Sequence, residues 1–212
     1  MQLVELFQEG LFQLRGTEYS RGSSERSLMS RSPTNLVWLD LETTGLNVET
    51  RAIIEIATII TDKDLNVIAE GPDLVIRQPE STLGALDEWC RDQHGASGLL
   101  RASRQSTVSL EDAENQTLAF VKAHCPPRAC PLAGNSICFD RRFLIRYMPR
   151  LEAHLNYRNV DVSTLKELCY RWRPGVMKTV VKESTHRALD DIRESIDELR
   201  HYREKLFGGL HG

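Results

Sequence analysis

The order of strand-like and helix-like segments constrains the fold of this chain most strongly. Residues 36–42 and 53–60 are apolar runs of strand length, and residues 65–70 form a third, with a short apolar stretch at 74–76 as its continuation. A polar turn, residues 62–64, joins the second run to the third. Such short polar connections are typical of neighbouring antiparallel strands. The sequence therefore predicts an antiparallel meander at the start of the folded region.

After Pro79 the pattern changes to helices alternating with short strands. We expect helices over residues 83–94, 110–124, 139–147, 164–173 and 187–206, and short strands over residues 132–135 and 159–162. Ser163 is placed to cap the helix that follows it, and an apolar stripe marks one side of the last helix as buried. This order indicates an α/β fold, with a mixed five-stranded sheet flanked by helices.

The composition fits one folded domain with an appendage. The chain has 212 residues, of which 41% are hydrophobic, enough for a full core. Residues 1–34 are rich in serine and charged residues, and we interpret them as a flexible N-terminal extension of a domain over residues 35–212. No apolar run approaches the roughly 18–20 residues that a membrane span needs, so no membrane partner is expected.

The net charge and the cysteine content indicate how the protein could bind nucleic acid and where in the cell it is found. The formal net charge of −3 argues against a broad basic surface, so any nucleic acid would have to meet a local basic patch or metal ions. The five cysteines include no C-x-x-C pair, which is typical of reduced thiols inside a cell. We expect a cytoplasmic protein. A mitochondrial location is the alternative, although four glutamates among the first 25 residues argue against an organellar leader.

Two carboxylates stand in the first strand-like run. Asp40 and Glu42 are two residues apart, and side chains of a strand alternate, so both lie on one face with Leu39 and Leu41 on the other. Buried side by side, the two acids would repel each other and lose hydration, and they would need a neutralising positive charge. A strand end at which both acids reach solvent explains the pair equally well at this point.

Further acids stand at the starts of two later helices. Asp140 follows a buried strand, and Asp191 lies in the first turn of the last helix, close in sequence to His186. His186 and Asp191 are about 140° apart around a regular helix, so they converge only if His186 lies in the loop before it. His186 and Asp190, four residues apart, would instead share a face as a helical metal-binding pair. The spacing leaves both arrangements open.

Four blocks of sequence together resemble the oligoribonuclease family, a branch of the DEDD 3′→5′ exonucleases whose third motif carries histidine. The blocks are W-L-D-L-E-T-T-G-L at 38–46, G-N-S with a following Asp at 134–140, D-V-S-T-L-K-E-L at 161–168, and H-x4-D at 186–191. They occur in order, and the resemblance covers residues 36–207. The resemblance implies an RNase H-like fold, a homodimer, and removal of 5′-mononucleotides from RNAs of about two to five nucleotides, chiefly dinucleotides.

The resemblance also implies roles for individual residues. The carboxylates that would hold two Mg²⁺ or Mn²⁺ ions are Asp40, Glu42, Asp140 and Asp191. The general base would be His186. The pair that wedges and stacks the two bases would be Leu46 and Trp89. The residues that would cap the 5′ phosphate are His94, Ser136, Arg158 and Ser163. Tyr157 matches a tyrosine that the partner subunit contributes to the site.

This set of residues suits phosphodiester hydrolysis. Two divalent ions acidify a bound water and stabilise charge on the leaving oxygen, and Mg²⁺ and Mn²⁺ prefer oxygen ligands. Histidine can accept a proton near neutral pH. The sequence departs from the family at Thr43, where methionine is usual, and at Phe139, where a polar residue is usual. A general DEDD exonuclease for single-stranded DNA or longer RNA is the alternative enzyme, and an inactive binding module is the alternative outside the enzymes.

Overall fold

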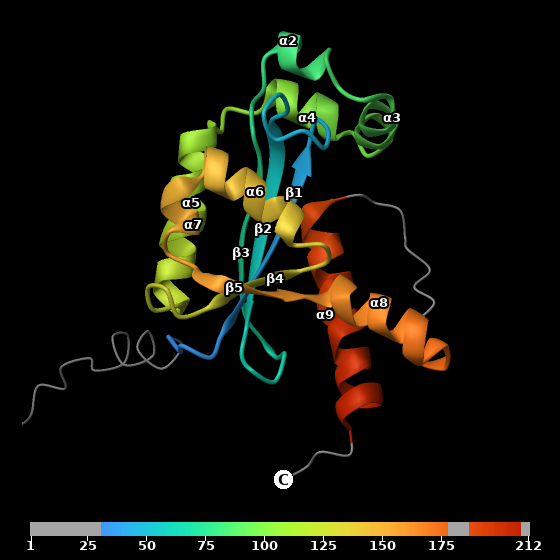
Figure 1. Ribbon diagram of the computed structural model, residues 1–212. Coiled ribbons are helices and arrows are strands. Elements are labelled where there is room, and N and C mark those ends of the chain that lie inside the picture. Colours follow the sequence, from blue (N-terminus) through green and yellow to red (C-terminus); the bar gives the residue numbers. More distant parts are fainter. Residues whose placement is uncertain (1–30, 178–186, 209–212) are drawn as a thin grey trace, which may run out of the picture.

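A computed structural model describes residues 31–177 and 187–208. Its centre is a sheet of five strands: β1 (Leu36–Thr43), β2 (Ile53–Thr61), β3 (Val67–Val75), β4 (Pro131–Gly134) and β5 (Asn156–Asp161). They lie in the order β3-β2-β1-β4-β5 (Figure 1). The first three strands pair antiparallel, whereas β1, β4 and β5 pair parallel. The expected mixed sheet and antiparallel meander are therefore confirmed.

Helices connect the strands and cover the sheet. They are α2 (Glu80–Leu83), α3 (Glu88–Ala96), α4 (Leu99–Gln105), α5 (Leu110–His124), α6 (Cys138–Tyr147), α7 (Pro149–Glu152), α8 (Val162–Trp172), the 3-10 helix η1 (Pro174–Val176) and α9 (Ala188–Phe207). Among these described helices, none has both the length and the hydrophobicity required to span a membrane. Of the extension expected over residues 1–34, the first 30 residues lie outside the described part of the chain.

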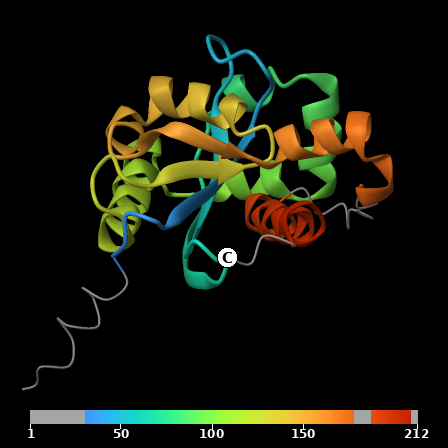
Figure 2. The ribbon, with the colours of Figure 1, turned by 60° about the horizontal axis from the view of Figure 1, so that its bottom comes forward.

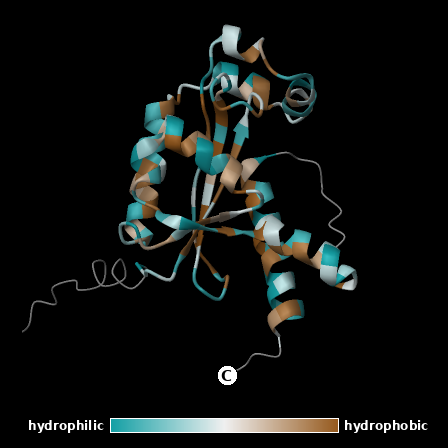
Figure 3. Ribbon diagram, in the orientation of Figure 1, coloured by the Kyte–Doolittle hydropathy of each residue, from teal (hydrophilic) through white to brown (hydrophobic). Residues whose placement is uncertain are grey.

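Two hydrophobic layers enclose the sheet because the side chains of β1 alternate. Leu39 belongs to a core with α5 and α6, whereas Trp38 belongs to a core with α9. Figures 1 and 2 show α9 on the side of the sheet away from α5, and Figure 3 shows hydrophobic residues along the central strands. The strand β2 is buried along its whole length. A polar side chain on β1 or β2 therefore lies in largely apolar surroundings.

The structure shows that the single helix expected over residues 83–94 is wrong. The chain forms α2, turns over residues 84–87 and begins α3 at Glu88. Arg51 holds this break, because its guanidinium donates to the Ala85 carbonyl and to the Asp87 carboxylate. Arg51 is distant in sequence, so the local apolar spacing contained no sign of the break. The helix α4 was not expected from the sequence either.

The structure also corrects the start of α8. Ser163 is not its cap; the Asp161 carboxylate accepts the Ser163 N–H at 2.9 Å, and the helix begins at Val162. The preceding strand is longer than expected, because its pairing with β4 begins at Asn156 opposite Pro131. Residues 157 and 158 therefore lie on an edge strand of the sheet.

Candidate active site

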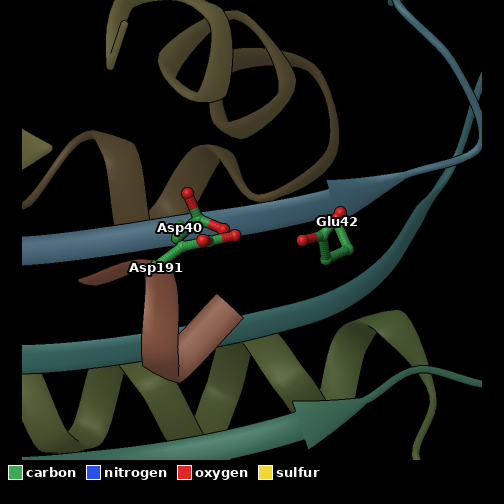
Figure 4. Close-up of side chains that lie close together, drawn as sticks. All are labelled: Asp40, Glu42 and Asp191. Carbon is green, nitrogen blue, oxygen red and sulfur yellow. The ribbon is translucent and has the colours of Figure 1, made fainter. Parts of the chain in front are cut away.

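Three carboxylates meet where β1 passes the first turn of α9. Asp40 and Glu42 lie on β1 and Asp191 on α9, and one oxygen from each side chain lies within 4.8 Å of one from each of the others. Figure 4 shows the carboxylates of Asp40 and Asp191 directed at each other, with Glu42 farther along the strand. The Glu42 side chain is only 14% exposed. This burial does not fit the alternative in which both strand acids reach solvent.

Asp140 approaches the same part of β1 because its carboxylate accepts a backbone N–H of that strand. β4 pairs with β1 only at Val37 and Trp38, so the Leu41 N–H extends beyond the end of β4. The Asp140 carboxylate, in the first turn of α6, accepts this N–H at 3.0 Å. Asp140 is almost fully buried, and it lies outside the group of three within 4.8 Å. One of its oxygens is thus occupied by the backbone of β1.

Burial makes these carboxyls weak acids, and repulsion between neighbouring acids adds to the effect. Loss of hydration is the main cause that raises the pKa of Glu42 to about 8, and repulsion by Asp191 and other nearby acids adds to it. Desolvation also raises the pKa of Asp40 well above its usual range, with repulsion by Asp140 and Glu42 as the next causes. Burial raises the pKa of Asp140 to about 7. A bound divalent cation would remove this repulsion.

Glu55 fixes the start of α9 beside the cluster, and it was not recognised from the sequence as a site residue. It stands opposite Glu42 in the β1–β2 pairing, and its side chain is fully buried. One carboxylate oxygen accepts the Arg187 Nε–H at 2.8 Å, and the other accepts the Ala188 N–H at 3.1 Å. A charge inside an apolar strand requires such a partner, and that requirement was the available sequence signal. This contact anchors the helix that carries Asp191.

His94 lies beside the carboxylate cluster, whereas Asp190 lies apart from it on the exposed side of α9. His94 is buried; its Nε2–H donates to the Thr43 carbonyl at 2.9 Å, and its Nδ1 lies 3.8 Å from Glu42. His94 is thus adjacent to the carboxylate cluster. His186 lies outside the described residues. Asp190 pairs with Arg193 at 3.2 Å on the exposed side of α9, whereas Asp191 points into the cluster.

Leu46 and Trp89 come from two segments that are tied together. Both side chains are exposed, Leu46 on the loop after β1 and Trp89 on α3. Arg51 connects the loop to Asp87 at the start of α3. Gly45 has a φ of 149°, and a Cβ on it would lie 2.2 Å from an oxygen of Asp87, so only glycine permits this approach. The loop and α3 therefore present two exposed apolar side chains from one connected unit.

A cavity of about 320 Å³ opens beside the carboxylates. Asp40 and Asp191 line one part of it, and its polar lining includes Asn135, Ser136, Ser163, Lys166, Ser195 and Glu198. The Ser136 and Ser163 hydroxyls are 3.1 Å apart, and the Ser136 N–H donates to the Ser163 hydroxyl at 2.9 Å. The two serines assigned to the 5′ phosphate thus lie together. Of the described residues, His94 and Arg158 are not among those that line this cavity.

Tyr157 and Arg158 lie on the edge strand β5. Tyr157 is 77% exposed. Arg158 Nε donates to the Tyr157 hydroxyl at 3.1 Å, and the guanidinium lies 5.3 Å from the centre of the tyrosine ring. The Tyr157 side chain is therefore open to solvent at the edge of the sheet.

Comparisons with known proteins agree with this geometry. The exonuclease family model RNase T matches residues 37–199. The oligoribonuclease of Pseudomonas aeruginosa is 59% identical over 174 residues, which are 82% of this chain and 97% of that protein. This chain belongs to the oligoribonuclease family. A second oligoribonuclease, from Vibrio cholerae, is 57% identical over 179 residues, which are 84% of this chain and 99% of that protein. The chain is therefore a nuclease, a hydrolase with an exonuclease domain.

Solved structures show the RNase H-like fold that this oligoribonuclease shares with longer exonucleases. Exonuclease I of E. coli, in a complex with single-stranded DNA, matches with a TM-score of 0.65 at 16% identity, over 84% of this chain and 42% of that protein. Exonuclease I of Methylocaldum szegediense matches with a TM-score of 0.62 at 20% identity, over 81% of this chain and 40% of that protein. The chain thus spans about two fifths of these longer proteins.

The donor set of the oligoribonuclease site fits the divalent metals on which DEDD exonucleases depend. The grouped donors from Asp40, Glu42 and Asp191 are all carboxylate oxygens, the ligands that hard divalent cations prefer. The raised pKa values of Asp40 and Glu42 share the same causes, burial of the carboxyl group and then repulsion by the neighbouring acids. Both observations favour the binding of a cation by these carboxylates.

Proposed function

We propose that this oligoribonuclease removes 5′-mononucleotides from the 3′ end of RNAs of about two to five nucleotides, with dinucleotides as its main substrates. The observation that carries the proposal is the cluster of Asp40, Glu42 and Asp191, in a chain 59% identical over 174 residues to the Pseudomonas aeruginosa oligoribonuclease. Grouped acids of this kind suit metal-assisted hydrolysis of a phosphodiester.

We propose Mg²⁺ or Mn²⁺, two ions per site, as the resident metals. Asp40, Glu42 and Asp191 would hold them through carboxylate oxygens. Asp140 would contribute the oxygen that does not accept the Leu41 N–H. When bound, the ions supply an acidified water and positive charge beside the phosphate oxygens. The Leu41 and Glu55 contacts keep Asp140 and the start of α9 in place, so these acids need little reorganisation to bind the ions.

The proton of the attacking water goes to His186 in this proposal, because a neutral imidazole accepts a proton near pH 7. The assignment rests on the family motif. The adjacent Arg187 is held by Glu55 at 2.8 Å, and this contact supports it, because the residue after His186 is anchored beside the carboxylates.

Selection of short substrates would come from two kinds of contact. Leu46 and Trp89 would pack against the bases, and each stacked base contributes roughly 1–3 kcal/mol. Ser136 and Ser163 would bind the terminal phosphate and close the end of the site. A closed end turns a further nucleotide into a steric obstacle. The exposed, linked positions of Leu46 and Trp89 and the paired serines support this arrangement.

We also propose a homodimer in which Tyr157 of one subunit contributes to the site of the other. Its exposure on an edge strand supports this role, because a side chain exposed at the edge of the sheet is accessible to a second subunit. Arg158, which holds the tyrosine hydroxyl, would accompany it. The bacterial relatives favour the cytoplasm as the compartment.

The test is hydrolysis of 5′-phosphorylated RNAs of increasing length, from two to about twenty nucleotides, with Asp40→Asn as the inactive control. We expect kcat/KM to be highest for the dinucleotide and to fall at least about tenfold by five nucleotides, because stacking contributes at only two positions. The same series in DNA tests the choice of sugar. Equal turnover of two-mers and twenty-mers would refute the proposal and favour a general DEDD exonuclease.

A further inference from the structure

The cavity beside the carboxylates contains one positive charge that no assignment has used. Among the described residues that line it, Lys166 is the only basic one, whereas Asp40, Asp191, Glu194 and Glu198 are acidic. A phosphate that entered this cavity away from the metal-binding acids would meet a negative surface without Lys166. The lysine therefore decides whether a second anionic group can bind here.

The structure holds Lys166 in position through a buried network. Its Nζ lies 3.3 Å from Oε1 of Glu198, a carboxylate that is almost fully buried. Glu198 also accepts the Tyr202 hydroxyl at 3.1 Å and the Asn135 amide at 3.2 Å. A lysine ammonium carries three hydrogens, and the ion pair requires only one of them. Lys166 can therefore keep Glu198 and still donate to a ligand in the cavity.

The same network connects Lys166 to the paired serines. Asn135 donates to Glu198 and accepts the Ser163 hydroxyl at 3.0 Å, and this fixes the orientation of the Asn135 amide. Lys166 follows Ser163 by three residues on α8, so the two side chains lie on the same side of that helix. The cavity is thus lined by the carboxylates of Asp40 and Asp191 and also by a connected polar group that contains Ser163, Asn135, Glu198 and Lys166.

We propose that Lys166 is a specificity-determining residue that binds the terminal 5′-phosphate of a short oligonucleotide. The inference rests on the proposed function, in which the scissile phosphate lies at Asp40 and Asp191. A 5′-phosphorylated dinucleotide has one further phosphate, its terminal monoester, which carries about −1.5 to −2 charges near pH 7. A lysine binds such a group as a point charge. A dinucleotide with a 5′-hydroxyl lacks this group and gains nothing from Lys166.

The other basic candidates for this phosphate lie elsewhere in the described chain. Arg158 is directed to the Tyr157 ring, and buried His94 lies beside Glu42. Neither lines the cavity that contains Ser136 and Ser163. Among the described residues, Lys166 is therefore the basic side chain that this cavity offers to a terminal phosphate.

The test compares a 5′-phosphorylated dinucleotide with the matching 5′-hydroxyl dinucleotide. In Lys166→Gln we expect kcat/KM to fall about 10- to 100-fold for the phosphorylated substrate and less than about threefold for the hydroxyl one, the range for loss of a charged hydrogen bond. Lys166→Arg should retain most of the preference. The matched control is Arg171→Gln, which removes one positive charge from an exposed pair with Glu167 on the same helix and should change neither value.

Equal losses on both substrates would overturn the proposal, because Lys166 would then act on the metal-binding acids or the fold. An unchanged preference would overturn it as well. Binding of the two dinucleotides in Ca²⁺, measured by calorimetry, separates this inference from the proposed function. If the wild-type protein binds the phosphorylated dinucleotide more tightly and Lys166→Gln loses that difference, the role of Lys166 holds even where no hydrolysis is found. If the difference persists in Lys166→Gln, that role is refuted.

Discussion

The buried carboxylates predict that the metal-free protein becomes less stable as the pH rises. In the unfolded chain Glu42 loses its proton near its ordinary pKa of 4.5, whereas the folded protein retains it up to about pH 8. Between these values the folded state binds more protons than the unfolded state, so a higher pH favours unfolding. Below about pH 4.5 both states are protonated, and above about pH 8 both are ionised. Stability therefore falls with pH only between these values, and the loss is complete above about pH 8.

The expected magnitude follows from the same pKa. A change from 4.5 to about 8 corresponds to about 5 kcal/mol, at about 1.4 kcal/mol for each tenfold change in proton affinity. The Glu42 side chain is only 14% exposed, so solvent screens this effect weakly. Domains are typically stable by about 5–15 kcal/mol, so the loss is a large fraction of the total. Ions that bind the ionised acids should restore this stability at high pH and contribute little near pH 5.

The assay is denaturant unfolding in EDTA at about pH 5 and about pH 8.5, repeated with Mn²⁺, for the wild-type protein and Glu42→Gln. Comparing the variant with the wild-type protein removes the contribution of all other titrating groups, because both proteins contain them. We expect the two proteins to be similarly stable at pH 5 and the variant to be more stable by several kcal/mol at pH 8.5 in EDTA. Mn²⁺ should stabilise the wild-type protein more than the variant at pH 8.5. The same pH dependence for both proteins in EDTA would refute the reasoning.

Four further substitutions test the site. Asp40→Asn should lower kcat/KM at least about 100-fold, since even the loss of residues that support metal ligands costs about 10–100-fold; retention of more than about a tenth of the activity would contradict a metal-binding role. Glu55→Gln and Arg187→Gln should each weaken Mn²⁺ binding about 10- to 100-fold by calorimetry. Their double variant should lose little more, and fully additive losses would argue against a shared contact. Tyr157→Ala should dimerise but turn over slowly, and mixing it with Asp40→Asn should restore activity if Tyr157 acts in trans; confirmed heterodimers without activity would argue against this.

The parts of the site that follow from local periodicity could be predicted from the sequence. Strand alternation placed Asp40 and Glu42 on one face, and the structure has them there. The apolar stripe of α9 identified its buried side, with Ile192 and Ile196 in the core. Spacing alone could not choose between Asp190 and Asp191, because both stand in the first turn of that helix. In the structure Asp190 pairs with Arg193 on the exposed side, and Asp191 belongs to the cluster.

Residues whose role depends on distant partners could not be found in this way. Glu55 interrupts an apolar strand, and its partner Arg187 is 132 positions away. Lys166 belongs to a sequence block that resembles the family, but its place in the cavity depends on Glu198 of another helix. The break between α2 and α3 depends in the same way on Arg51. In each case a charged side chain supplies a contact that no local pattern records.

The location of the cluster follows from the unequal lengths of β1 and β4. Because β4 ends at Gly134 and pairs with β1 only as far as Trp38, the Leu41 N–H has no strand partner on that side. A buried N–H without a partner costs roughly 1–3 kcal/mol, so a side chain that accepts it is favoured there, and Asp140 does so. A longer β4 would have accepted the Leu41 N–H through a backbone carbonyl, and the Asp140 carboxylate would then not be needed as its acceptor. The short strand therefore brings a fourth carboxylate close to the other three. Repulsion among these four acids, which contributes to the raised pKa of Asp40, favours the binding of a cation.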